Sequence, residues 1–200
     1  MGSGGTYTHL PRRRRGGKIF LTLDTATELV RQAEAVGLEE LHLQAWPSAP
    51  GDWLDVALRL AALSPRVVVK LPAVPDALRA AAVLKGRGTR VLITAISNPL
   101  HGLWAAEVGA DFVAPYVGRL NEAGRDAHAL IDTLVALQNR QGPVVLAASI
   151  RDLATLGRLV TQGVGAVTLR KALLDEALAD EATLSAVAQF EAVRRGTAGA

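Results

Sequence analysis

The feature that most constrains the fold is one alternation that repeats from Lys18 onward: a short apolar run, a turn, and then an amphipathic or alanine-rich segment. Each apolar run is rich in Val, Ile or Leu and almost free of polar residues, as is typical of strands buried on both faces. We therefore expect seven strands, at Ile19–Leu23, Leu41–Ala45, Val67–Leu71, Val91–Ala95, Phe112–Val117, Val144–Ala148 and Ala166–Leu169.

The segments between these runs are expected to be helices, and glycine follows several of them, as a helix stop commonly requires. They lie at Thr27–Val36, Trp53–Leu63, Pro75–Lys85, Leu100–Val108, Asp126–Gln138 and Asp152–Thr161, with a last long helix over about Leu173–Arg195. Strands that alternate with helices imply parallel pairing and right-handed crossovers.

Both an open doubly wound sheet and a closed barrel fit that alternation. No G-x-G-x-x-G follows the first strand, which argues against nucleotide binding. The sequence predicts an α/β fold, a TIM-type (β/α) barrel that is short by about one βα unit, because a complete barrel has about eight strands. A long C-terminal helix completes the expected fold.

The chain of 200 residues is long enough for one domain. We expect residues 1–17 to form a flexible basic leader, since glycines flank the run Arg12–Arg15. Residues 18–200 would form the single barrel domain. A basic leader can bind nucleic acid, but no aromatic residue lies among the arginines to stack on bases. We therefore expect no nucleic-acid partner.

Composition argues against several other classes. The absence of cysteine excludes a disulfide scaffold and a thiolate nucleophile, and four histidines without close pairing do not suggest a metal site. No cofactor is expected. No apolar run reaches the roughly 20 residues of a membrane span, and the leader lacks the apolar core of a signal peptide. The expectation is a soluble, cytoplasmic protein without a membrane partner.

Polar side chains recur where the apolar runs stop, and in a parallel barrel those positions face the active site. They are Asp24, Gln44, Lys70, Thr94, Tyr116, Ser149 and Arg151. Lys70 is the most informative, because it has apolar neighbours on both sides and lysine is seldom buried. In an apolar pocket its amine becomes available as a nucleophile. The alternative is a lysine at a strand end that extends to water.

Four segments carry a resemblance to a known family: VVVKLP at 67–72, VLITA at 91–95, FVAPYVGR at 112–119 and VLAASIRD at 145–152. With this order and spacing, the chain resembles the transaldolase family, and within it the short branch that includes fructose-6-phosphate aldolase. The similarity runs from about Leu41 to the segment that contains Phe190.

The resemblance implies roles for matching positions. Lys70 matches the Schiff-base lysine, and Tyr116 matches the acid/base tyrosine of the aldolase branch. Gln44 and Thr94 fall where the family holds a catalytic water, and Asp24 resembles an aspartate that assists proton transfer at the end of the first strand. The positions that hold the substrate phosphate are matched by Arg119, Ser149 and Arg151.

The implied activity is that of a class I aldolase or transaldolase, which makes or breaks a carbon–carbon bond in a ketose or sugar phosphate. The family also implies a homo-oligomer assembled through terminal helices. The match breaks between Asp24 and Gln44, where the family's T-T-N-P-S segment and about one βα unit are absent. This break keeps an alternative open: a transaldolase-like protein that binds sugar phosphates without turnover.

Overall fold

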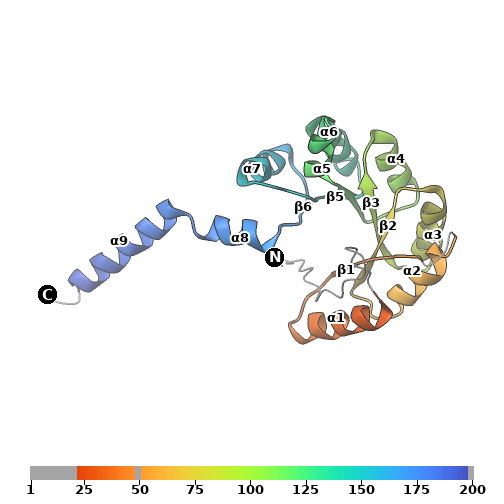
Figure 1. Ribbon diagram of the computed structural model, residues 1–200, viewed down its shortest axis with the longest axis horizontal. Coiled ribbons are helices and arrows are strands. Elements are labelled where there is room, and N and C mark those ends of the chain that lie inside the picture. Colours follow the sequence, from red (N-terminus) through yellow and green to blue (C-terminus); the bar gives the residue numbers. More distant parts are fainter. Residues whose placement is uncertain (1–21, 48–50, 198–200) are drawn as a thin grey trace.

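The computed structural model describes residues 22–47 and 51–197, and within them six parallel strands form one sheet (Figure 1). Each strand pairs with the next along the chain, in the order β1-β2-β3-β4-β5-β6. The strands are β1 (Leu41–Gln44), β2 (Val67–Pro72), β3 (Arg90–Ile96), β4 (Phe112–Pro115), β5 (Val144–Ala147) and β6 (Ala166–Val167). The helices are α1 (Leu23–Ala35), α2 (Trp53–Ala61), α3 (Pro75–Gly86), α4 (Pro99–Glu107), α5 (Val117–Glu122), α6 (Ala127–Gln138), α7 (Leu153–Gln162), α8 (Lys171–Leu178) and α9 (Glu181–Thr197).

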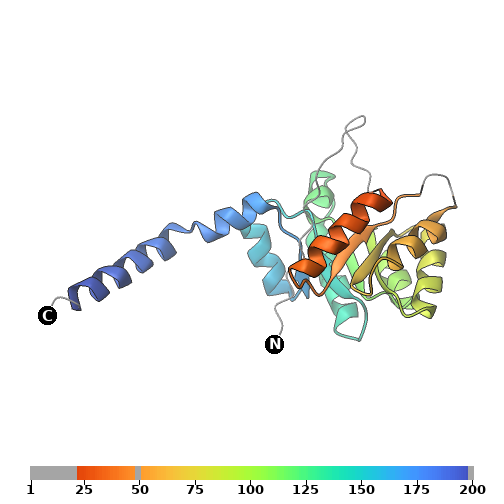
Figure 2. The same cartoon turned by 90° about the horizontal axis from the view of Figure 1, so that it is seen from below.

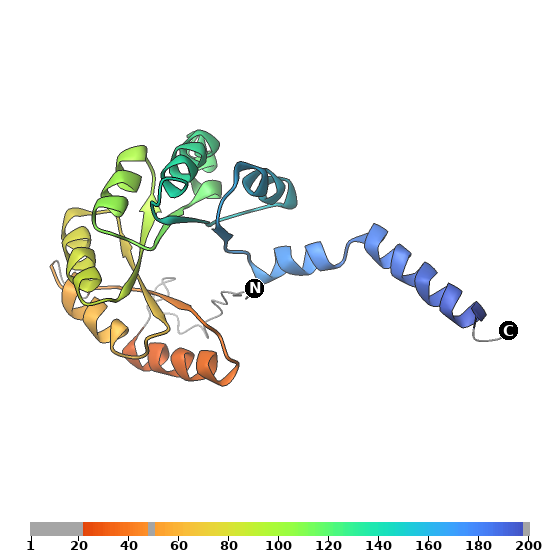
Figure 3. The same cartoon turned by 180° about the vertical axis from the view of Figure 1, so that it is seen from behind.

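The sheet curls into a half-barrel whose convex side is covered by helices α1 to α7 (Figures 1 and 3). Because β1 and β6 stand at the two ends of the strand order, the described sheet is open. The α/β fold of a short TIM-type barrel with a long C-terminal helix is thus confirmed. None of the described helices is long and apolar enough to cross a lipid bilayer.

Alternation along the strands divides the sheet into two faces. Val67, Val69 and Leu71 pack into the large core beneath the helices. Val68 instead packs on the concave face, in a small cluster with Leu92, Ala114 and Leu146. Because successive strand residues point to opposite faces, the residue two positions beyond a concave-face residue also faces inward. This pattern places polar residues at the carboxyl ends of the strands on the concave face.

The expected first strand at Ile19–Leu23 is wrong where the structure describes it. Leu23 begins α1, and the Thr22 side chain caps this helix by accepting a hydrogen bond from the Thr25 amide at 3.2 Å. Asp24 therefore lies exposed in the first turn of a helix and not at the end of a strand. A threonine cap followed by an acidic residue is favourable at a helix start, which explains the difference. Residues 1–21, with the arginine leader, lie outside the described residues.

Two further boundaries differ from expectation. The strand expected to reach Val117 ends at Pro115, and Tyr116 leads directly into the short helix α5. The single C-terminal helix expected over Leu173–Arg195 is instead divided into α8 and α9. Asp180 marks the break, because its carboxylate accepts a hydrogen bond from the Thr183 amide at 2.8 Å. Such a cap starts a new helix.

A close backbone contact joins α5 to the loop after β5. The Gly118 amide donates a hydrogen bond to the Ser149 carbonyl at 3.0 Å, and the Val117 amide donates to the Ala148 carbonyl at 2.9 Å. A Cβ atom on Gly118 would lie 2.3 Å from the Ser149 carbonyl oxygen. Ser149 itself has a positive φ of 62°. Only glycine at position 118 permits this approach, which fixes the loop carrying Ser149 and Arg151.

We expect Gly118→Ala to lower the free energy of unfolding by about 1–3 kcal/mol, because the new methyl group overlaps backbone that cannot rotate away. Gly157→Ala on α7 is the matched control, since nothing lies within 4 Å of the position that its new methyl group would take. That control should gain up to about 1 kcal/mol from helix propensity. Urea denaturation of both variants measures the difference, and equal stabilities would contradict the proposed packing.

Candidate active site

Four of the residues singled out in the sequence lie on adjacent strands, or directly after one, at one end of the concave face. Strand register places Gln44 of β1 beside Lys70 of β2. Thr94 of β3 lies beside Pro72, two residues beyond Lys70 along β2, and Tyr116 directly follows β4. Because the carboxyl ends of parallel strands meet at one edge of a sheet, these residues lie toward the same end of the sheet, beyond the apolar cluster, and are here called the polar layer.

Lys70 is a partly accessible lysine with no counter-charge. Among the described residues, its ammonium group has neither a hydrogen-bond partner nor an ion-pair partner. Burial lowers the pKa of Lys70 below that of an ordinary lysine, because desolvation disfavours the charged form. The environment therefore makes the neutral amine easier to reach than in an exposed lysine, and the side chain is still partly accessible.

The Gln44 side chain is oriented by the backbone around Lys70. Its amide nitrogen donates hydrogen bonds to the carbonyl oxygens of Ala45 and Lys70, both at 3.1 Å. This fixes the plane of the amide next to the lysine. The Gln44 carbonyl oxygen is then the side-chain atom available to accept a hydrogen bond from a water molecule or ligand.

Thr94 and Tyr116 form a hydrogen-bonded pair. The Thr94 hydroxyl, which is almost completely buried, donates to the Tyr116 hydroxyl oxygen at 2.7 Å. The proton of Tyr116 itself is therefore left for another acceptor. The backbone is irregular next to this pair. The β3–β4 register shifts between Thr94 and Ile96, and Ala95 has a positive φ of 57°.

The expected phosphate-binding residues gather around the start of α5. The Arg119 guanidinium lies over the Tyr116 ring, 4.8 Å from the ring centre. Ser149 is held against Gly118, and the Arg151 side chain packs beside the same glycine. Arg151 also forms an ion pair with Glu122 at 2.8 Å. Two arginines and a hydroxyl can hold a phosphate group there through charge-assisted hydrogen bonds.

Asp24 is the expected site residue that the structure does not join to the others. No hydrogen bond or ion pair in the described part of the chain links its carboxylate to the polar layer. Conversely, sequence reasoning missed His42, a buried residue two positions before Gln44 on the same face of β1. The alternation of polar residues in LHLQ was the signal that could have indicated it.

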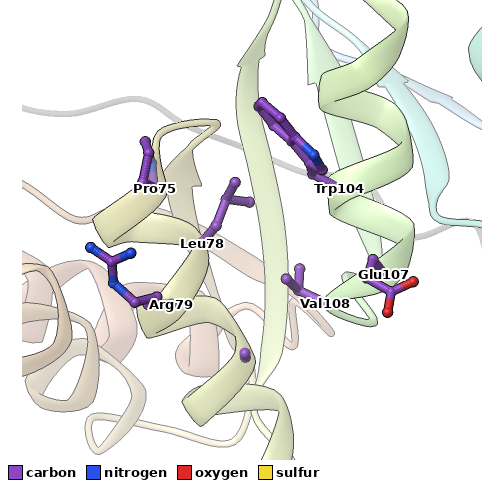
Figure 4. Close-up of a pocket in the computed structure, with 7 residues that line it drawn as sticks. Pro75, Leu78, Arg79, Trp104, Glu107 and Val108 are labelled. Atoms are coloured by element: carbon purple, nitrogen blue, oxygen red, sulfur yellow. The ribbon is translucent and has the colours of Figure 1, made fainter.

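The structure also contains a cavity of about 370 Å³, but it lies away from this layer. It is formed between α3 and α4 (Figure 4), and its lining residues are Pro75, Leu78, Arg79, Ala82, Trp104, Glu107 and Val108. All of them belong to the outer helical layer, on the opposite side of the sheet from Lys70. Within residues 22–47 and 51–197, no three His, Cys, Asp or Glu side chains converge as metal ligands would.

The sequence that carries this lysine, amide, hydroxyl pair and two arginines is similar to those of known proteins. A sequence model of the family described as transaldolase/fructose-6-phosphate aldolase matches residues 25–198. The chain belongs to this family.

Relatives in the transaldolase/fructose-6-phosphate aldolase family are moderately similar to this chain. A probable transaldolase of Caulobacter sp. (strain K31) is 34% identical over 134 residues, which cover 66% of this chain and 62% of the relative. A probable transaldolase of Dehalococcoides mccartyi is 34% identical over 145 residues, covering 72% and 67%. A probable fructose-6-phosphate aldolase of Streptococcus pneumoniae is 33% identical over 126 residues, covering 62% and 57%. The chain thus spans about two thirds or less of these relatives.

Burial of an unpaired lysine in this family member makes stability depend on pH. The folded-state pKa of Lys70 is lowered, so the unfolded chain binds more protons between that pKa and the ordinary value of about 10.4. Unfolding is therefore favoured at lower pH. We expect Lys70→Met to raise the free energy of unfolding at pH 7 by on the order of 1 kcal/mol, reduced by the partial exposure of the site.

The gain should shrink as the pH rises through the lowered pKa of the folded state toward the ordinary value of about 10.4, above which both states hold a neutral amine. Urea denaturation between pH 6 and 10 measures this trend. Lys171→Met is the matched control, because Lys171 is an exposed helical lysine paired with Asp175. A gain for Lys70→Met that does not change with pH would contradict the assigned cause.

Proposed function

We propose that this protein is a class I aldolase or transaldolase that acts on ketose or sugar-phosphate substrates through a Schiff base on Lys70. The observation that carries the proposal is the Lys70 amine, which has a lowered pKa and no counter-charge and lies beside the Gln44 amide. Membership of the family and the names of the relatives support the same class of reaction.

In this proposal the neutral Lys70 amine attacks the ketone carbonyl carbon and forms a carbinolamine. Loss of water gives an iminium ion, which withdraws electrons from the bond between its α and β carbons. A base takes the proton of the β-hydroxyl group, that bond breaks, and an aldehyde leaves while an enamine remains on the lysine. Protonation of the enamine and hydrolysis release the ketone fragment, whereas attack of the enamine on a second aldehyde transfers it.

Tyr116 is the proposed acid and base for these steps. Its hydroxyl oxygen accepts the Thr94 hydrogen bond, so its own proton can be donated to the departing hydroxyl group of the carbinolamine. Gln44 would orient a water molecule through its carbonyl oxygen. Asp24 stays a candidate for proton transfer on the resemblance to the family, from its exposed position in the first turn of α1.

Arg119, Ser149 and Arg151 are proposed to bind the phosphate of a phosphorylated substrate. Arg119 lies over the Tyr116 ring, and Ser149 and Arg151 follow the next strand, β5, so a bound sugar phosphate would extend from Lys70 across β3 and β4 toward β5. Tyr116 favours direct aldol cleavage and synthesis over transfer, as the resemblance to the aldolase branch implies.

A second candidate function is binding of sugar phosphates without turnover. The open edges of the described sheet favour it, because an incompletely closed barrel admits water to the reacting centre.

Borohydride trapping distinguishes the two. Incubation with dihydroxyacetone or fructose 6-phosphate, followed by reduction, should leave a stable adduct on Lys70 that intact-mass and peptide mass spectrometry detect. The adduct should vanish in Lys70→Met and persist in Lys171→Met. If the folded parent protein forms no adduct with either ketose, the aldolase proposal fails and the binding function takes its place.

We also propose that the protein is a homo-oligomer assembled through its C-terminal helices. Helices α8 and α9 extend away from the half-barrel (Figure 2), and α9 presents apolar side chains spaced three residues apart. Leu184, Val187 and Phe190 are 53%, 45% and 70% exposed. An extended helix with such a stripe gains stability when a second copy covers it.

We expect Phe190→Asp to shift the protein from an oligomer to smaller species, because a buried carboxylate opposes association. The matched control is Val160→Asp, which adds the same charge at an exposed position of α7 on the half-barrel. Size-exclusion chromatography with light scattering measures the mass, and circular dichroism checks that the fold persists. A monomeric parent protein would contradict the proposal.

A further inference from the structure

A buried histidine lies below the proposed catalytic layer, on the same concave face. His42 is only 5% exposed, and its ring packs edge-to-face against Phe112 with ring centres 5.1 Å apart. It precedes Gln44 by two residues on β1, and register places it beside Val68. His42 is therefore diagonal to Lys70 on the neighbouring strand, and nothing in the proposed mechanism uses it.

Hydrogen bonding determines which ring nitrogen carries the proton. His42 Nε2 is 3.3 Å from the Glu40 carboxylate, which can only accept a hydrogen bond. The proton of a neutral ring thus belongs on Nε2, and Nδ1 holds a lone pair. Glu40 is itself held in place by an ion pair with Arg90. The contact with Glu40 consequently fixes the orientation of the imidazole ring.

The lone pair on Nδ1 is left unsatisfied. Nδ1 is fully buried and has no hydrogen-bond partner among the residues that the structure describes. A buried acceptor without a donor costs about 1–3 kcal/mol, so its persistence calls for an explanation. A complementary group lies on the adjacent strand and on the same face: among the described residues, Lys70 is a donor without an acceptor.

We propose that His42 is a positioning residue for Lys70: the two groups are not hydrogen-bonded in the described conformation, but a turn of the Lys70 side chain lets Nδ1 accept a hydrogen bond from its amine and hold that amine on the concave face. The inference rests on the proposed Schiff-base function of Lys70. An amine that donates one N–H to Nδ1 keeps its own lone pair for attack on a carbonyl carbon. The role requires a neutral imidazole, because a protonated ring has no lone pair to offer.

The charged groups around the ring are consistent with a neutral state. Burial, as the largest effect, lowers the pKa of His42; Glu40 opposes this, while the positive charges of Lys70 and Arg90 lower it further. The direction of the Lys70 effect agrees with the position of Lys70 on the neighbouring strand, diagonal to His42.

The first test needs no substrate. Nitrogen-15 NMR of the imidazole reports the protonation and hydrogen bonding of each ring nitrogen. In the parent protein, His42 should show a proton on Nε2 and a hydrogen-bonded lone pair on Nδ1. The Nδ1 signal should shift in Lys70→Met and stay unchanged in Lys171→Met. Identical His42 signals in the parent and Lys70→Met would overturn the inference.

The second test measures the effect on chemistry. We expect His42→Phe, which keeps a ring against Phe112, to slow borohydride-trapped adduct formation at pH 7 by roughly tenfold, because the amine is no longer oriented. His42→Gln retains a hydrogen-bond acceptor and should recover most of the rate. His128→Phe is the matched control, since His128 lies on α6 and bonds to Gln162.

These outcomes distinguish a histidine that only stabilises the fold from one that affects the reaction at Lys70. A histidine that is only structural would change urea stability in His42→Phe while leaving the trapping rate of the folded protein at the parent value, and that result would overturn the inference. If the parent protein forms no adduct, the proposed function fails, and the NMR comparison alone decides whether His42 is bonded to Lys70.

Discussion

The site depends on a lysine whose amine is partly buried without a counter-charge. Removing a cation from water is unfavourable unless it is paired or loses its proton, and the described surroundings of Lys70 supply no acid. The neighbouring polar groups are engaged elsewhere: the Gln44 amide with backbone carbonyls, and the Thr94 hydroxyl with Tyr116. Among the described residues, this arrangement leaves the Lys70 amine without a partner on the concave face, and the role proposed for it rests on that.

Strained backbone supports the layer around that amine. Ala95 and Ser149 both have positive φ angles, which cost non-glycine residues roughly 1–3 kcal/mol. Ala95 directly follows Thr94 near the end of β3, and Ser149 lies in the loop after β5. At Ala95 the irregularity accompanies the turn of Thr94 toward Tyr116. At Ser149 it is stabilised by the close approach of Gly118. The unfavourable backbone energy of these two residues is offset by the packing of the large core between the sheet and the helices on its convex side.

An open sheet is compatible with this site. Gln44, Lys70, Thr94 and Tyr116 come from β1, β2, β3 and the end of β4, four consecutive neighbours in the strand order. Parallel pairing fixes their relative heights without any contribution from a strand that would close the barrel. The edges at β1 and β6 therefore lie beside the polar layer and do not interrupt it. The open edges of the described sheet therefore leave the strand register around the lysine intact.

Local sequence determined much of this protein. Unbroken apolar runs indicated buried parallel strands, and the residues that end them, such as Lys70 and Thr94, were identified because a strand has a fixed two-residue period. Where local signals compete, prediction failed: a threonine cap made Leu23 helical, and the Asp180 cap divided the last helix. The tertiary structure alone decided that Thr94 donates to Tyr116, that α5 packs against Ser149, and that His42 Nδ1 lies buried without a partner. These depend on strand register and on contacts between residues far apart in the chain, which no local pattern encodes.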